Sequence, residues 1–114
     1  MFVLWRVTKN PRYKEYGWEM FRAIQRHARL EATAHKSKAC GFSGIKDVTA
    51  EKAEADDYMQ SFFVAETLKY LYLLHSEASV FPLDDYVFNT EAHPFKRFDR
   101  SRNEAWWASA EDWL

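Results

Sequence analysis

The amino-acid sequence predicts an all-α chain with a short extended segment near its C-terminal end. Two observations predict the helices. Apolar residues recur at helical spacing between residues 10 and 30, and an apolar run of helical length lies between residues 57 and 76. A third observation, the short run Tyr86-Val87-Phe88 after turn residues, predicts the extended segment. At 114 residues, the chain is at most one domain or part of one.

The composition limits the classes of ligand and partner. Lys and Arg number 16 and Asp and Glu number 17, so the net charge is -1 and no basic stripe can follow a phosphate backbone. We therefore expect no nucleic-acid partner. The single cysteine, Cys40, excludes an internal disulfide and a cysteine cluster for zinc, and we expect a buried or idle thiol. No apolar run reaches the roughly 20 residues of a membrane helix, and "MFVLW" is too short for a signal-peptide core.

The first two helical segments are predicted from their end signals and spacing. Residues 1–7 have apolar side chains from the first position and no capping residue, so we expect the chain to begin inside a helical element. Asn10 is the expected N-cap of the next helix, and Pro11 its first residue, where a missing N–H costs nothing. Gly17 weakens this helix by roughly 1 kcal/mol relative to Ala, which suggests that another backbone packs closely there.

Polar residues and turn signals fill residues 31–56, and we expect a long ordered loop. Within it, "GFSGIKDV" could form a short extended piece between two glycines. The next helix is expected to be capped by Asp56 or Asp57. Its apolar residues cover nearly the whole circumference, which predicts burial on all sides.

Charged residues inside that apolar helix require an explanation, because a buried charge must be paired, protonated or in contact with a cavity. One interpretation is an ion pair between Glu66 and Lys69, or between Glu66 and an arginine elsewhere. The other is that Glu66 lines a polar pocket, where a carboxylate beside an aromatic ring such as Phe62 is typical of a sugar site. The residues alone leave both open.

The octet "VFNTEAHP", residues 87–94, follows a turn expected at Pro82 and residues 84–85, and we expect Pro94 to end the segment. Thr90 and Glu91 are either solvated turn residues or part of a metal site. A threonine can offer its hydroxyl and its carbonyl oxygen, both hard ligands suited to Ca²⁺, and Glu91 could orient bound waters.

Four segments decide between these interpretations: "RVTKNPRYKEYGWEMF", "GFSGIKDV", "QSFFVAETLKYLYLL" and "PLDDYVFNTEAHPF". In this order they closely resemble the C-terminal part of the class I α-1,2-mannosidases, glycoside hydrolase family 47, over about residues 1–95. The resemblance implies the C-terminal portion of an (αα)7 barrel, with a short β-hairpin near the C-terminus that plugs one end. It also implies calcium-dependent removal of α-1,2-linked mannose from high-mannose N-glycans, with inversion at the anomeric carbon.

The resemblance assigns roles to four residues of this chain. Thr90 matches the threonine that binds Ca²⁺ through its hydroxyl and carbonyl oxygens. Glu66 and Glu91 match carboxylates of the same site, and Phe62 matches the aromatic residue under the sugar ring. The acid and base carboxylates are expected upstream of Met1, so we expect no catalytic residue in this chain and no turnover from it alone. We also expect the rest of the barrel to be missing from this chain.

The resemblance leaves other features open. Residues 96–114 form an extension of unknown role, in which Trp106, Trp107 and Trp113 either pack back on the barrel or belong to an unrelated segment. Gln60 favours the Golgi-type subgroup, and the family implies the secretory pathway, Golgi or endoplasmic reticulum, with membrane contact only through an N-terminal anchor absent from this chain. Two alternatives are a mannose-binding, glycan-sorting relative in quality control and a helical interaction module that has lost its site. The motif "FNTEAHP" favours the enzyme.

Overall fold

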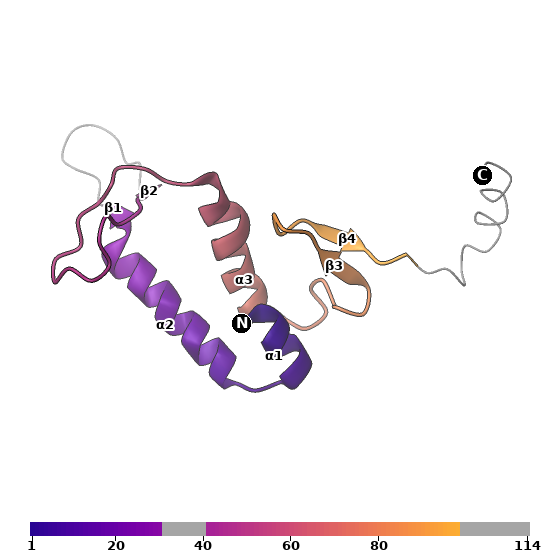
Figure 1. Ribbon diagram of the computed structural model, residues 1–114. Helices are drawn as coiled ribbons and strands as arrows, with labels where there is room; N and C mark the ends of the chain where they lie inside the picture. Colours follow the sequence, from indigo (N-terminus) through magenta and orange to yellow (C-terminus); the bar gives the residue numbers. More distant parts are fainter. Residues whose placement is uncertain (31–40, 99–114) are drawn as a thin grey trace, which may run out of the picture.

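Helices and two small antiparallel sheets make up the computed structural model, which describes residues 1–30 and 41–98 (Figure 1). The helical segments are α1 (Phe2–Thr8), α2 (Arg12–His27), the π-helix η1 (Phe63–Leu68) and α3 (Lys69–His75). The paired strands are β1 (Arg29–Leu30) with β2 (Gly41–Phe42), and β3 (Tyr86–Phe88) with β4 (Pro94–Lys96). The helical class and the hairpin are confirmed, whereas a closed barrel stays a prediction. Cys40, Trp106, Trp107 and Trp113 lie outside the described residues.

The first two helices begin and end where local signals direct them. At the end of α1, Lys9 adopts the left-handed conformation with φ of 57° and donates its N–H to the Trp5 carbonyl. The Asn10 side-chain oxygen then accepts the Arg12 N–H at 3.1 Å, beside Pro11. The predicted start of α2 is therefore right to within a residue. In the described part of the chain, no helix is long and apolar enough to cross a membrane.

The loop after β2 is held by backbone contacts, as expected of an ordered loop. The Gly44 N–H donates to the Tyr58 carbonyl at 2.8 Å, and Ile45 forms an isolated bridge with Ala55. The predicted aspartate cap is wrong. Asp56 instead accepts hydrogen bonds from Ser43 and Tyr58 within the loop. Asp57 has a φ of 57°, and helical structure starts only at about Ser61.

The π-helix η1 was not predicted. It continues directly into α3 as one helical rod (Figure 1), and the winding changes from π-helical to α-helical at Lys69. Periodicity could not reveal this change, because the apolar residues cover the whole circumference. Single π-helical turns occur frequently at functional sites, and this one contains Glu66.

The core lies where α1 and α2 meet α3. Phe2, Leu73 and Leu74 are its fully packed members, and Tyr70 and Phe88 lie against them. A Cβ atom on Gly17 would overlap the Leu74 side chain and would lie 3.2 Å from His75 Cε1. The close neighbour predicted at Gly17 therefore exists, but it consists of side chains and not of another backbone.

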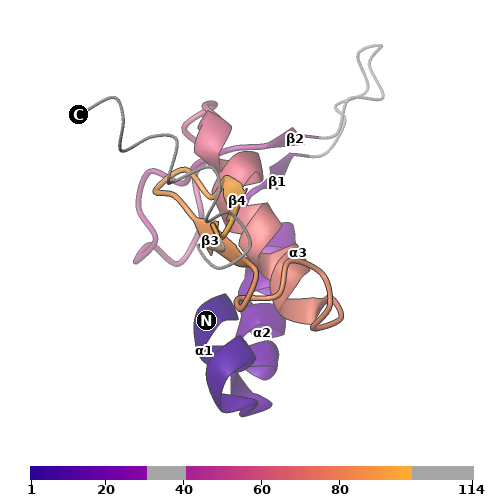
Figure 2. The same cartoon turned by 90° about the vertical axis from the view of Figure 1, so that its right-hand side faces the viewer.

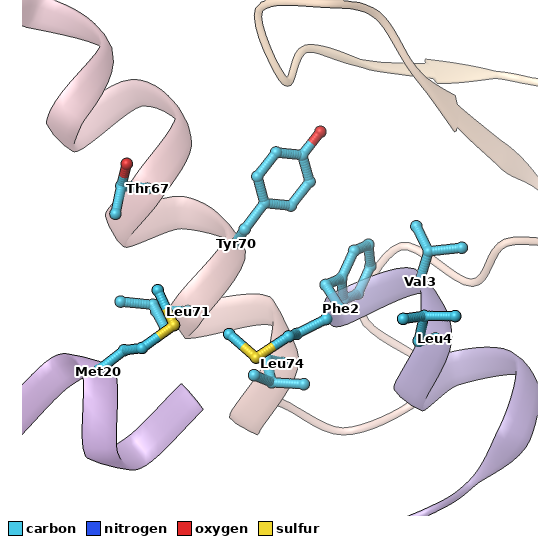
Figure 3. A pocket seen from close by; sticks show the side chains of 9 residues that line it. Phe2, Val3, Leu4, Met20, Thr67, Tyr70, Leu71 and Leu74 are labelled. Atoms are coloured by element: carbon cyan, nitrogen blue, oxygen red, sulfur yellow. The ribbon is translucent and has the colours of Figure 1, made fainter. Parts of the chain in front are cut away.

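The prediction that this helix is buried on all sides is wrong for the described structure. Leu71, Leu73 and Leu74 are buried, whereas Phe62 and Tyr72 are 53% and 66% exposed. An apolar cleft of about 330 Å³ also lies open between α1, α2 and the η1–α3 rod (Figure 3). Within residues 1–30 and 41–98, the helix is thus only partly covered.

A buried arginine joins α1 to the end of α3. The Arg6 guanidinium donates to the carbonyl oxygens of Leu73 (3.2 Å), Glu77 (3.0 Å), Val80 (3.0 Å) and Ala78. The last carbonyls of a helix lack intrahelical donors and favour a cation. Burial lowers the pKa of Arg6 from its ordinary value, although hydrogen bonds surround its terminal nitrogens. Arg6 therefore fixes the point where the chain leaves α3.

Replacing Arg6 with Met should destabilise the chain, because it leaves several carbonyl oxygens without donors. We expect the free energy of unfolding to fall by about 3 kcal/mol in urea denaturation. Arg22→Met, at an exposed position of α2, is the matched control and should change it by under about 0.5 kcal/mol. Equal losses in the two variants would contradict a specific role for Arg6.

Candidate functional site

The candidate site residues of the C-terminal octet lie in the turn of the β3–β4 hairpin. The strands pair in the register Tyr86 with Lys96, Val87 with Phe95 and Phe88 with Pro94, which leaves residues 89–93 as the turn. Pro94 therefore begins β4, and the prediction that it ends the segment is wrong. The first residue of a strand is one of the few strand positions that tolerate a missing N–H.

Asn89 builds this turn. Its side-chain oxygen accepts the N–H groups of Glu91 (3.0 Å) and His93 (2.8 Å), and its own N–H donates to the His93 carbonyl at 3.1 Å. Ala92 completes the turn with a φ of 59° and is fully buried. The Asn89 side-chain oxygen is therefore engaged in the turn. The tendency of Asn to bond backbone groups two residues ahead was the available signal.

Thr90 lies exposed at the tip of the turn. Its hydroxyl and carbonyl oxygens accept no hydrogen bond from any residue of the described chain. Because the neighbouring N–H groups are bound to Asn89, the backbone on both sides of Thr90 is fixed. The turn thus presents two oxygen atoms of one residue in a defined position, both without a hydrogen-bond donor in the described part of the chain.

Lys69 attaches the turn to the helical rod. Its ammonium group donates to the Ala92 carbonyl at 2.9 Å, and it follows directly after η1. The ion pairs among the described residues are Lys46 with Glu54 at 2.6 Å and His93 with Glu91 at 3.8 Å. In this part of the chain, Glu66 therefore has neither Lys69 nor an arginine as a partner. Sequence reasoning missed the contact because it joins residues far apart along the chain.

Contacts among three aromatic rings join the hairpin to the helices. The ring centroids of Phe2, Tyr70 and Phe88 lie 5.6 to 5.8 Å apart, and the Tyr70 ring extends from α3 toward the hairpin (Figure 3). Such aromatic pairs contribute beyond their buried area. The turn consequently lies beside the η1–α3 rod in both views of the chain (Figures 1 and 2).

Glu66 affects the pKa of the Tyr70 hydroxyl. The pKa of Tyr70 is raised, first by burial and second by the negative charge of Glu66. Glu66 precedes Tyr70 by four residues, about one helical turn, and Tyr70 packs on Phe88, the last residue before the turn. The structure therefore brings the Thr90 turn to the helical segment that carries Glu66. Phe62 lies about one helical turn earlier and lines a separate hollow, which it shares with Tyr58.

The donor set has the chemistry that calcium prefers, but it is incomplete. Calcium takes about six to eight oxygen ligands, of which Thr90 can supply two. The Glu91 carboxylate is exposed next to it and could hold water bound to the metal. The described residues contain no group of three or more His, Cys, Asp or Glu side chains that could hold a metal. The remaining ligands would have to be water, sugar hydroxyls or other protein groups.

The substitution Glu66→Gln should lower the pKa of Tyr70. A nearby negative charge disfavours the tyrosinate, so its removal makes ionisation easier, while the burial of the ring is unchanged. Ultraviolet absorbance followed from neutral to alkaline pH measures this, with Tyr70→Phe to identify the signal. Glu91→Gln is the matched control and should leave the Tyr70 titration unchanged. An unshifted titration in Glu66→Gln would show that Glu66 does not face Tyr70.

Comparison with known proteins identifies the family of the chain. The chain matches the model of glycosyl hydrolase family 47 over residues 1–97. It is 53% identical to mannosyl-oligosaccharide alpha-1,2-mannosidase IA of Drosophila melanogaster over 93 residues, which cover 82% of this chain and 13% of that protein. It is 50% identical to mannosyl-oligosaccharide 1,2-alpha-mannosidase IC of Homo sapiens over 104 residues, 90% of this chain and 15% of that protein. A mannosyl-oligosaccharide 1,2-alpha-mannosidase of Arabidopsis thaliana is 51% identical over 96 residues, which cover 84% of this chain and 15% of that protein.

These matches cover most of this chain but only 13 to 15% of the length of those three relatives. The match also includes the four segments on which the resemblance rested, all of which lie within residues 1–97. The chain belongs to glycosyl hydrolase family 47.

Proposed function

We propose that this chain supplies the calcium-binding and sugar-binding part of an inverting α-1,2-mannosidase that trims α-1,2-linked mannose from high-mannose N-glycans. The observation that carries the proposal is the turn at Thr90. Two hard oxygens without a hydrogen-bond donor among residues 1–30 and 41–98 are held there in a hydrogen-bonded hairpin, and the Lys69 contact joins this hairpin to the rod that contains Glu66. Family membership and the names of the similar mannosidases support the same reaction.

Thr90, Glu91, Glu66 and Phe62 each have a defined role in this proposal. Thr90 holds Ca²⁺ through its hydroxyl and carbonyl oxygens, and Glu91 and Glu66 accept hydrogen bonds from bound water and sugar hydroxyls. When bound, the metal would supply a hard cation that grips and orients hydroxyl groups of the mannose. Phe62 offers its exposed ring to the apolar face of the sugar.

Hydrolysis with inversion requires two further carboxyl groups, one as acid and one as base, far enough apart to admit a water molecule. We assign neither to this chain and expect both in the part of the family domain that the chain does not cover. The 114 residues alone should then release no mannose. The exposed apolar residues of the η1–α3 rod, such as Val64 and Tyr72, suit contact with that remaining part in an (αα)7 barrel.

The proposed substrate also defines where the whole protein works. High-mannose N-glycans are processed in the secretory pathway, so we propose the Golgi or the endoplasmic reticulum as its location. Membrane attachment would then belong to an N-terminal anchor outside this sequence. The division of the chain into part of the family's catalytic domain, residues 1–95, and an extension, residues 96–114, stays a prediction.

Calorimetric titration with Ca²⁺ tests the role of Thr90. The wild-type chain should bind one ion, and Thr90→Val should weaken binding by ~100-fold, because it removes a hydroxyl ligand while preserving the shape of the side chain. Thr90→Ser keeps the hydroxyl and is the matched control, with affinity close to that of the wild type. Equal affinity in Thr90→Val, or loss in Thr90→Ser alone, would contradict the assignment.

A further inference from the structure

Lys69 lies at the junction where η1 passes into α3, and it bonds to both halves of the proposed site. Its ammonium group donates to the Ala92 carbonyl at 2.9 Å, and its backbone N–H donates to the Glu66 carbonyl. Lys69 therefore joins the helical segment that carries Glu66 to the turn that carries Thr90. It is not itself a ligand of metal or sugar in the proposed function.

The Lys69 ammonium does not pair with the carboxylate nearest to it along the chain. Charged residues three apart in a helix can form an ion pair. The two ion pairs found among residues 1–30 and 41–98 nevertheless include neither Glu66 nor Lys69. The half-buried Lys69 side chain uses a neutral carbonyl oxygen instead. This arrangement leaves the Glu66 carboxylate available to bound water or to a sugar hydroxyl.

The carbonyl that Lys69 holds belongs to a strained residue of the turn. Ala92 has a φ of 59°, in the left-handed region that is unfavourable for a residue with a Cβ atom. Its side chain is fully buried, and its N–H donates to the Asn89 carbonyl at 3.1 Å. Hydrogen bonds on both sides of Ala92 therefore stabilise the backbone conformation that places Thr90 at the tip of the turn.

The charge of Lys69 and its hydrogen bond should affect metal binding in opposite directions. An ammonium group near a bound Ca²⁺ repels it, so removing the charge alone would strengthen binding. Removing the hydrogen bond would weaken binding, because a turn released from Ala92 must be ordered again when the metal binds. The direction of the change in affinity therefore separates the two effects.

We propose that Lys69 is a positioning residue for the calcium site. By holding the Ala92 carbonyl, it fixes the Thr90 turn against the helical rod and leaves the Glu66 carboxylate unpaired. An ammonium group released from Ala92 could pair with Glu66 three residues earlier, so loss of the contact would affect both halves of the site. The inference rests on the proposed function, since it requires Ca²⁺ to bind at Thr90.

Calorimetric titration of the full chain and its Lys69 variants with Ca²⁺ tests this role. Lys69→Met keeps an unbranched side chain but removes every donor, and it should weaken binding by about tenfold, as expected for a residue that orients a metal ligand. Lys69→Arg retains a charged donor and should restore most of the affinity. Lys96→Met removes an exposed lysine of the same hairpin and is the matched control, with the affinity of the wild type.

Circular dichroism of the aromatic side chains shows whether each variant is folded. If Lys69→Met does not fold, Lys69→Gln replaces it. Glutamine keeps a polar group at this half-buried position but is shorter than lysine, so the same loss of affinity is expected.

Three results overturn the positioning role and leave the proposed function intact. They are a folded Lys69→Met or Lys69→Gln variant that binds Ca²⁺ as tightly as the wild type or more tightly, an equal loss in Lys96→Met, and a loss in Lys69→Arg as large as that in Lys69→Met. Failure of the folded wild-type chain to bind Ca²⁺ overturns the proposed function, and the role of Lys69 with it.

Discussion

The buried guanidinium of Arg6 is the constraint on which the rest of the structure depends. A cation removed from water must be surrounded by acceptors, and here carbonyl oxygens at the end of α3 and in the following turn provide them. The contact ties α1 to a segment more than sixty residues later in the chain. It also fixes where the chain leaves α3 and therefore the path that leads to the β3–β4 hairpin.

From that fixed exit, two further contacts set the position of the candidate site. Phe88 packs on Phe2 and Tyr70, and Lys69 holds the carbonyl of Ala92. These contacts lie on either side of Thr90 along the chain, so the calcium ligand proposed there has little freedom to move away from the helical rod. The exposed threonine at the tip of this hairpin accepts no hydrogen bond from the described residues, which suits a metal ion whose remaining ligands are water, sugar or other protein groups.

The sequence predicted the features that arise from local chemistry. Asn10 accepts the N–H of Arg12, the first residue of α2, and the "YVF" run forms β3, because the side chains that determine them are neighbours along the chain. The π-helix around Glu66 and the loop role of Asp56 could not be predicted, since an all-round apolar pattern fits several helical windings and Asp56 bonds to Ser43 across the loop. The roles of Thr90 and Glu66 came from family resemblance, and the structure adds the contacts that bring their segments together.

The central claim is that Thr90 and Glu66 serve one metal-dependent sugar site. Titration with Gd³⁺, a hard paramagnetic ion that can replace Ca²⁺ at oxygen ligands, tests it most directly, because it broadens the amide signals of residues near the metal. The account predicts that the Thr90 and Glu66 signals broaden together at low metal concentration, before that of Arg22 on the exposed face of α2. Broadening confined to exposed acidic residues such as Asp47, with Thr90 and Glu66 unaffected, would contradict it.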